Sequence, residues 1–229
     1  HYLSPRQGRG QFYRMLELLY AVEPQPVEPD YRKALAYLAV FLGLFAFHSA
    51  WAALLGFHAA ILGSLWIARP NIPLSILLKN SNKKWIAVSL LVCGSSGFAL
   101  FFLWNVFGIA SDLPAQVEAL GLNAQTWFPF IAYFALVNPF IEEYFWRGYL
   151  GNATKSLHIS DFLYAGFHAL ILIHKVPIVS IFFAVAALAL AGWFWRQLAR
   201  EEGGGLLAPA LGHMAADFTI LVAICKMTT

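Results

Sequence analysis

The sequence predicts an all-α polytopic membrane protein, a helical bundle with about seven transmembrane helices. Of the 229 residues, 60% are hydrophobic and only 12% are charged, and the mean hydropathy is +0.64. So few charged residues cannot cover the surface of a soluble protein of this size. Long apolar runs also alternate with short clusters of Lys and Arg, which is typical of membrane helices joined by cytoplasmic loops.

Residues 1–33 are expected to form a cytoplasmic segment ahead of a transmembrane domain at 34–229. The segment mixes acidic and basic residues and contains the stretch PQPVEPD, whose prolines prevent a continuous helix. Before these prolines, residues 11–22 can form a short amphipathic helix on the membrane surface. A plain cytosolic tail fits this segment equally well.

The transmembrane domain begins with residues 34–68, which are apolar over about twice the length that one crossing needs. This length predicts two helices joined by a tight turn near residues 48–51. His48 and His58 are isolated polar residues here, and we expect hydrogen bonds between helices from them, not ligation or catalysis. The later crossings are expected at 85–108, 127–149, 157–174, 177–198 and 206–226.

Charge assigns the connections to two sides of the membrane. Basic residues cluster at alternate connections, and the positive-inside rule places that side in the cytoplasm. His174, Lys175 and Lys226 fall on the other side and are a weak exception. The basic residues on the cytoplasmic side are Arg32, Lys33, Arg69, Lys79, Lys83, Lys84, Lys155, Arg196 and Arg200.

The small residues between Cys93 and Gly97 predict close helix packing in the third crossing. The two cysteines, Cys93 and Cys225, both lie in apolar runs, so neither a disulfide framework nor a cysteine metal site is expected. The net charge of +3 is modest and dispersed. The expected partner is therefore the lipid bilayer, and nucleic acid is not implied.

The fourth crossing contains the most unusual stretch, NPFIEEYFWRGYL at residues 138–150. It places Glu142, Glu143 and Arg147 in an apolar, aromatic-rich segment. A charge in the bilayer costs a few kcal/mol even on mild insertion scales, so such residues point to function. An ordinary cluster of charges at the membrane interface is the alternative on this stretch alone.

Helical periodicity separates the roles of these residues. Glu143 and Arg147 are four residues apart and are expected to pair, whereas Glu142 points to another face without a local counter-ion, which suits a general base. Asn138 lies four residues before Glu142, shares its face and can steer it. Pro139 is expected to bend the helix before the two carboxylates.

Two further polar pairs lie in later crossings, Tyr164 with His168 and His213 with Asp217. Each pair is four residues apart and so lies on one helical face, where Asp217 can orient His213. Counted from the cytoplasmic helix ends, Glu142, His168 and His213 all lie at a depth of about 12 to 15 Å. This common depth predicts one shared site.

These motifs resemble those of the CPBP family, the CAAX proteases and bacteriocin-processing enzymes also called Abi proteins. EEYFWR fits E-E-x-x-x-R, YAGFH fits an aromatic-x-x-x-H motif, and HMAAD fits H-x-x-x-N/D, in the family's order. The resemblance spans about residues 127–226, the expected catalytic core. The family consists of glutamic intramembrane endopeptidases and includes the type II CAAX prenyl endopeptidases.

The resemblance implies that Glu142 and His168 activate a water molecule, while His213 and Asp217 bind the developing oxyanion or position the water. Glu143 and Arg147 would support the site, together with Tyr164 and Asn138, and no cofactor is implied. Some members have asparagine where Asp217 stands, and an ionised aspartate cannot donate to an oxyanion. The oxyanion role would then fall on His213, held by Asp217.

Other functions use the same residues. Glu142, His168, His213 and Asp217 could instead ligate a divalent metal as a zinc-dependent membrane protease does, although no HExxH pair occurs. A non-catalytic peptide-binding or immunity protein and a proton-coupled transporter are alternatives from other classes.

The expected substrate is a peptide or protein at the membrane, cleaved from the cytoplasmic leaflet. Prenylated C-terminal tails, bacteriocin or signalling-peptide leaders and sorting segments all fit the family, and no residue distinguishes among them. The expected location is a prokaryotic cell membrane.

Overall fold

The computed structural model describes residues 31–79 and 82–229, and every regular element in these residues is helical. The predicted all-α fold is therefore confirmed. The suggested surface helix at 11–22 lies outside the described residues. Residues Arg32–Thr229 form one compact unit, which contains the apolar helices.

The unit begins with a helical hairpin. Helix α2 (Tyr31–Phe41) continues as the π-helix η1 (Leu42–Ala46), and α3 (Ala50–Ala68) returns after a turn. The hydroxyl of Ser49 accepts a hydrogen bond at 3.2 Å from a backbone N–H in the first turn of α3 and so caps this helix. The turn predicted near residues 48–51 is confirmed.

Each later crossing that the sequence predicts coincides with one helix or with two consecutive helices. The elements after the hairpin are η2 (Leu74–Leu78), α4 (Lys83–Gly94), α5 (Ser96–Phe102), α6 (Leu113–Ala119), α7 (Trp127–Glu143), η3 (Tyr144–Tyr149), α8 (Ile159–Gly166), α9 (His168–Leu172), α10 (Ile178–Glu201) and α11 (Leu207–Thr228). By length and composition, α3, α4 with α5, α10 and α11 can each cross a membrane. Pro139 lies inside α7, which changes to the π-helix η3 five residues later.

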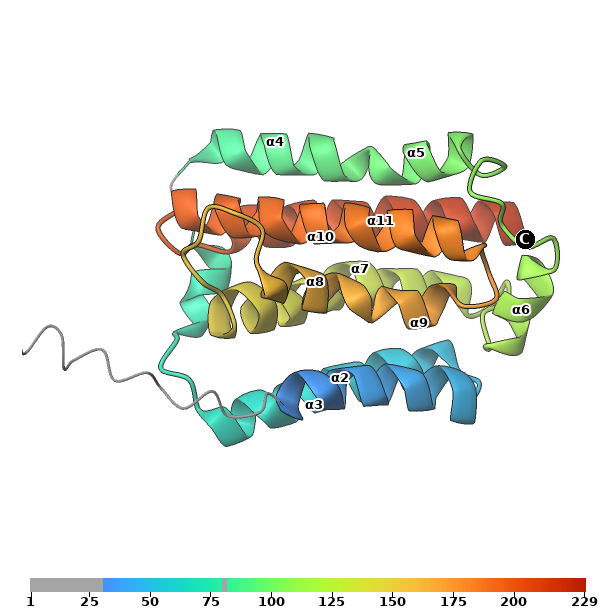
Figure 1. The fold of residues 1–229 in the computed structure, drawn as a ribbon, viewed down its shortest axis with the longest axis horizontal. Helices are drawn as coiled ribbons and strands as arrows, with labels where there is room; N and C mark the ends of the chain where they lie inside the picture. The colour runs from blue at the N-terminus through green and yellow to red at the C-terminus, as the bar shows by residue number, and fades with distance from the viewer. Residues whose placement is uncertain (1–30, 80–81) are drawn as a thin grey trace, which may run out of the picture. The chain divides into compact units, whose positions relative to one another are not determined.

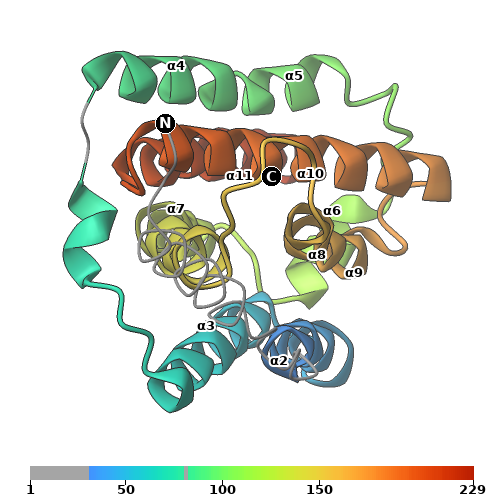
Figure 2. The ribbon, with the colours of Figure 1, turned by 60° about the vertical axis from the view of Figure 1, so that its left-hand side comes forward.

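The helices lie in layers (Figure 1). α4 and α5 form one outer layer, α10 and α11 come next, α7 follows together with α8 and α9, and the α2–α3 hairpin forms the other outer layer. α11 packs against α4, α5 and α7, whereas α10 packs mainly on α8. Figure 2 shows α7 and α8 between the hairpin and the α10–α11 layer. Side chains from α3, α8, α10 and α11 can therefore meet at α7.

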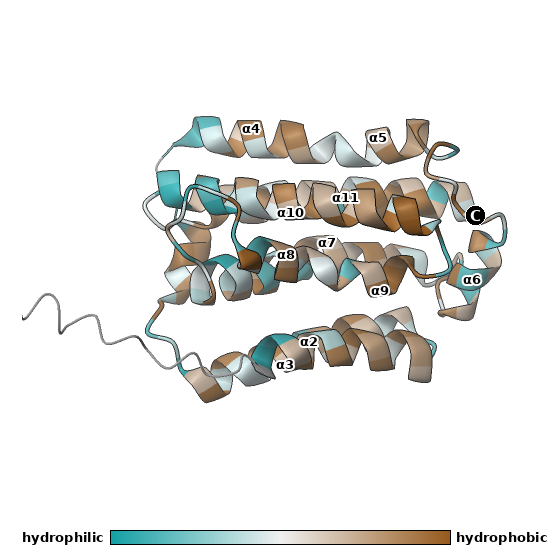
Figure 3. Cartoon of the chain, in the orientation of Figure 1, coloured by the Kyte–Doolittle hydropathy of each residue, from teal (hydrophilic) through white to brown (hydrophobic). Residues whose placement is uncertain are grey.

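The connections gather at two opposite ends of the bundle, as the alternation of charge predicts. At one end, Lys79 Nζ donates a hydrogen bond to the carbonyl of Gly203 at 2.8 Å. At the other end, the N–H of Ala110 donates to the carbonyl of Lys175 at 2.8 Å. Hydrophilic residues lie mostly near these ends, and the lengths of the helices are largely hydrophobic (Figure 3). The placement of the basic end in the cytoplasm stays a prediction.

Small residues set the separation between α11 and the α4–α5 layer. A Cβ added at Gly97 would lie 2.1 Å from the backbone carbonyl oxygen of Thr219 on α11. A Cβ added at Gly94 would lie 3.7 Å from the Ala215 methyl group, an ordinary contact. The close packing predicted for Cys93–Gly97 is therefore confirmed, and Gly97 is the residue that requires it.

We predict that Gly97→Ala lowers the free energy of unfolding by about 1–3 kcal/mol, because the new methyl group forces α5 away from backbone atoms of α11. Gly94→Ala is the matched control, since it has the same gain in helix propensity without the clash. Thermal unfolding of both variants in detergent micelles measures the difference. Equal melting temperatures for the two variants would contradict this account of the packing.

Candidate active site

The two adjacent glutamates end α7 in the interior of the bundle. Glu142 is 2% exposed and Glu143 is fully buried. The predicted pair forms, with Arg147 Nη1 donating to Glu143 Oε1 at 3.1 Å. Since residues four apart share a helical face, this contact follows from local geometry. Glu142 faces other partners, as its position one residue earlier requires.

His213 on α11 joins this pair from across the bundle. Its Nδ1 donates to Glu143 Oε1 at 2.9 Å. Its Nε2 lies 3.5 Å from Asp217 Oδ2 and 3.4 Å from the Tyr164 hydroxyl. Sequence reasoning assigned the orientation of His213 to Asp217 alone, but Glu143 makes the shorter contact. Glu143 therefore has two partners, Arg147 and His213, from two helices.

Asn138 connects the remaining carboxylates. Its Nδ2 donates to Glu142 Oε1 at 2.9 Å and to Asp217 Oδ2 at 3.2 Å. The other oxygen of Glu142, Oε2, is buried and has no hydrogen-bond partner among the described residues. A buried carboxylate oxygen without a partner is costly in a purely structural site. Glu142 is thus held by one oxygen, and Oε2 of Glu143 is likewise buried without a partner among the described residues.

Aromatic rings form the walls around these groups. The Trp195 ring on α10 stacks on His213 with a centroid distance of 4.5 Å and an interplanar angle of 19°. The Arg147 guanidinium lies 4.0 Å from the Tyr164 ring centroid and 5.1 Å from that of Trp195. A Cβ atom added at Gly192 would lie 3.0 Å from side-chain atoms of Arg147 and Tyr164. The glycine therefore lets these two side chains pack closely against α10. Sequence reasoning missed Trp195, because no motif distinguishes it from other aromatic residues of α10.

His168 lies at the edge of the cluster. It begins α9 directly after Phe167, whose backbone angles are helical, and its ring stacks on that of Phe167 at a centroid distance of 4.1 Å. Its Nδ1 donates to the carbonyl of Ala165 at 3.3 Å. The Tyr164 ring meets it edge-on at 5.7 Å, which fits the predicted flanking contact. His168 forms no hydrogen bond with Glu142, so the structure joins the two only through neighbours.

His58 on α3 reaches the site from the hairpin. Its Nδ1 lies 3.1 Å from the Tyr133 hydroxyl, and its Nε2 lies 3.0 Å from Asn138 Oδ1. The hydrogen bonding between helices that the sequence predicts for this histidine is confirmed. Its link to Asn138 was not predicted, because the sequence gives no register between α3 and α7.

The bonded cluster thus brings together most of the predicted site residues. Glu142, Glu143, Asn138, Arg147, Tyr164, His213 and Asp217 are linked by direct contacts, and only His168 stands apart. Among the residues at 31–79 and 82–229, no three His, Cys, Asp or Glu side chains form a group placed to hold a metal ion. The arrangement can hold a proton on Glu142 and offer donors from His213.

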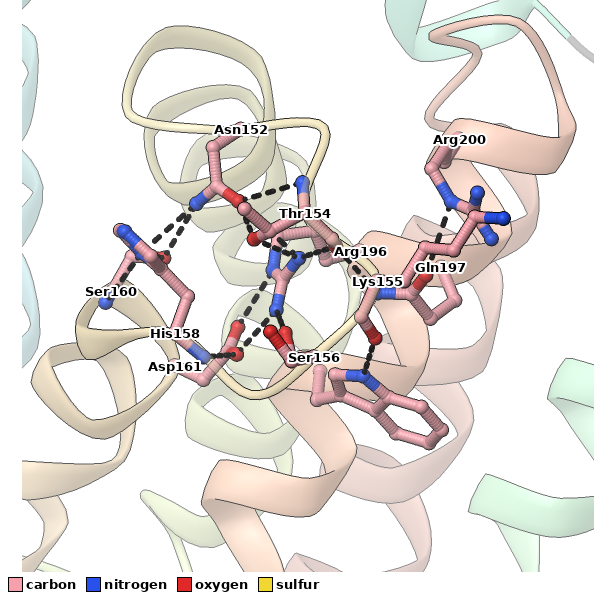
Figure 4. Close-up of polar contacts among 11 residues, drawn as sticks. Asn152, Thr154, Lys155, Ser156, His158, Ser160, Asp161, Arg196, Gln197 and Arg200 are labelled. Carbon is pink, nitrogen blue, oxygen red and sulfur yellow. Dashed lines mark hydrogen bonds and ion pairs between the residues drawn. The ribbon is translucent and has the colours of Figure 1, made fainter.

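A second buried polar cluster fixes α8 against α10 (Figure 4). Arg196 binds Asp161 through two bonds, Nε to Oδ1 at 3.0 Å and Nη2 to Oδ2 at 2.6 Å. Its other contacts are with the carbonyl and hydroxyl of Thr154, the carbonyl of Ser156 and the amide oxygen of Asn152. Because each guanidinium nitrogen has a protein partner, this cluster is structural. It fixes the loop that leads into α8, which carries Tyr164.

One comparison with known proteins gave a match, which covers part of the chain. The model of the family described as Type II CAAX prenyl endopeptidase Rce1-like matches residues 124–219. These residues contain every member of the bonded cluster. The match confirms the family that the motifs predicted, and it indicates a membrane-embedded peptidase of the CAAX-protease type. No curated protein and no solved structure gave a match.

We predict that Arg196→Met lowers the free energy of unfolding by about 3–5 kcal/mol, because it leaves Asp161 buried without its counter-ion. Both side chains of this pair are 3% exposed. Arg200→Met is the matched control on the same helix, since Arg200 and its partner Glu201 are 31% and 52% exposed. That change should cost less than about 0.5 kcal/mol. Denaturant unfolding in micelles measures both, and similar losses would contradict the structural role of Arg196.

Proposed function

We propose that this protein, which matches the CAAX prenyl endopeptidase family over residues 124–219, is a glutamic intramembrane endopeptidase. It hydrolyses a peptide bond of a membrane-associated or lipidated peptide without forming a covalent intermediate. The observation that carries the proposal is the setting of Glu142, which is buried and accepts a hydrogen bond only from the neutral Asn138 amide, whereas Glu143 binds both Arg147 and His213. The sequence resemblance gives the same residue the role of base.

Glu142 would act as the general base. Oε2 takes a proton from water while the water oxygen attacks the scissile carbonyl carbon. The carboxyl group then returns this proton to the amine nitrogen as the C–N bond breaks. The hydrogen bonding of Arg147 supports this role, because Arg147 donates to the neighbouring Glu143 and not to Glu142. The hydrogen bond from Asn138 to Oε1 of Glu142 stays in place during the reaction and keeps the orientation of Oε2 constant.

His213 would stabilise the oxyanion that develops on the carbonyl oxygen. Its Nδ1 donates to Glu143, so an Nε2 that also carries a proton is a donor fixed in place. Asp217 at 3.5 Å favours that protonated state, and the stacked Trp195 ring prevents rotation of the imidazole. A preorganised donor in a low-dielectric site can lower the barrier by several kcal/mol.

His168 would share the activation of water with Glu142, as the family resemblance implies. Its Nδ1 donates to a backbone carbonyl, which leaves Nε2 of the neutral ring as an acceptor. The absence of a direct bond between His168 and Glu142 leaves both free to contact one water molecule. Catalytic contacts are often long in the free enzyme and shorten when substrate binds.

The family description points to a prenylated C-terminal tail as the first substrate to test. Leader peptides and C-terminal sorting segments are the other substrates compatible with the resemblance. In each case the scissile bond must reach Glu142 from the lipid or from the end of the bundle with the basic connections, which the charge rule assigns to the cytoplasm.

We predict that Glu142→Gln reduces cleavage of a farnesylated CAAX peptide by about 10³-fold or more, because glutamine keeps the shape but cannot accept a proton. The assay uses purified protein in liposomes and detects the released tripeptide by mass spectrometry. Glu118→Gln, at an exposed position on α6, is the control and should retain full activity. A Glu142→Gln enzyme with normal turnover would rule out the proposed base.

We further predict that a strong chelator leaves the cleavage rate unchanged, because the proposed mechanism activates water with protein groups alone. Turnover is measured before and after incubation with 1,10-phenanthroline and again after zinc is added. Loss of activity with the chelator and its return with zinc would favour the zinc-dependent alternative, with ligands drawn from Glu142, His168, His213 and Asp217.

A further inference from the structure

A buried polar contact to the site comes from outside the matched residues, from His58, which lies on α3 and is 3% exposed. Both of its ring nitrogens have side-chain partners on α7. Nδ1 lies 3.1 Å from the Tyr133 hydroxyl, and Nε2 lies 3.0 Å from Asn138 Oδ1. A buried imidazole with hydrogen bonds at both nitrogens cannot rotate about its Cβ–Cγ bond without losing them.

Which atom donates in each hydrogen bond follows from which groups carry a hydrogen atom. The Nδ2 group of Asn138 faces Glu142 and Asp217, and ionised carboxylates only accept. The amide oxygen of Asn138 must then face His58, and a carbonyl oxygen also only accepts. Nε2 of His58 therefore carries a proton, and Nδ1 of the neutral ring accepts from the hydroxyl of Tyr133.

This chain of bonds fixes the Asn138 amide in one orientation. If the amide turned over, its oxygen would face two carboxylates and its NH₂ group would face the N–H of His58. The first change replaces two hydrogen bonds with repulsion between like groups, and the second breaks the bond to His58 unless the imidazole proton moves to Nδ1. The correct orientation holds Glu142 through Oε1 and leaves Oε2 free, which is the state that a base requires.

We infer that His58 is a positioning residue for Glu142, acting through the Asn138 amide. The inference rests on the proposed function, because it concerns the presentation of the catalytic carboxylate. It also makes the α2–α3 hairpin, which lies outside the matched residues 124–219, a part of the active site's support.

Two substitutions of His58 separate positioning from simple stability. The amide of glutamine lies as many bonds from the backbone as Nε2 does, so His58→Gln can still donate to Asn138. The amide of asparagine corresponds to Nδ1, so His58→Asn can reach Tyr133 but not Asn138. Each variant loses one buried hydrogen bond, and similar losses in melting temperature are expected.

We expect His58→Asn to lower kcat about 10- to 100-fold with little change in KM, the size of effect seen when a supporting hydrogen bond is removed. His58→Gln should recover most of this loss. His48→Asn is the matched control, since His48 is exposed in the hairpin turn with φ +47°, a conformation that asparagine tolerates. His48→Asn should keep the kcat and KM of the unchanged enzyme. Equal kcat for the two His58 variants, whether high or low, would overturn the inference.

A measurement without substrate keeps the inference separate from the proposed function. If the unchanged protein cleaves no prenylated peptide, the proposed substrate fails, whereas the bonding of His58 can still be tested. In protein labelled with ¹⁵N-histidine, the resonance missing from His58→Gln identifies His58. A neutral ring with its proton on Nε2 supports the chain of bonds, and a proton on Nδ1 alone overturns it.

Discussion

The burial of two carboxylates and an arginine within six residues of one helix is the constraint on which the bundle depends. Each of these groups must find hydrogen-bond partners away from lipid, because an unpaired charge there costs several kcal/mol. Glu143 has one local partner, Arg147, which lies one helical turn later in the chain. His213 on α11 and the Trp195 ring on α10 complete the surroundings, so the packing of three helices follows from the need to enclose these charges.

The two glutamates are chemically identical, and their environments give them different tasks. Glu143 binds a guanidinium and an imidazole, which together fix it as a structural anion. Glu142 is turned by about 100° around the helix and meets only the Asn138 amide. The hydrogen bond that orients Glu142 thus comes from a neutral amide, whereas Glu143 binds a guanidinium and an imidazole. In the proposed mechanism, the spacing of one residue therefore separates the supporting carboxylate from the catalytic one.

The sequence predicts the contacts that lie within a helix and misses those between helices. The Glu143–Arg147 pair follows from the helical period, which fixes the angle between any two residues of one helix. The stacking of Trp195 on His213 and the bond from His58 depend on how each helix is rotated about its axis. A membrane helix is apolar on all sides, so its hydrophobic pattern does not indicate which face turns inward. Charged motifs reveal the site, but its aromatic walls remain hidden among similar residues.

The position of His168 fits this division of roles. It follows Phe167, whose backbone angles are helical, and its ring stacks on Phe167 while Nδ1 binds the Ala165 carbonyl. The Tyr164 ring, four residues earlier, meets this imidazole edge-on at 5.7 Å. His168 thus packs beside the cluster without a hydrogen bond to Glu142, and the proposed mechanism uses this separation, because water and a peptide carbonyl must fit between the two groups.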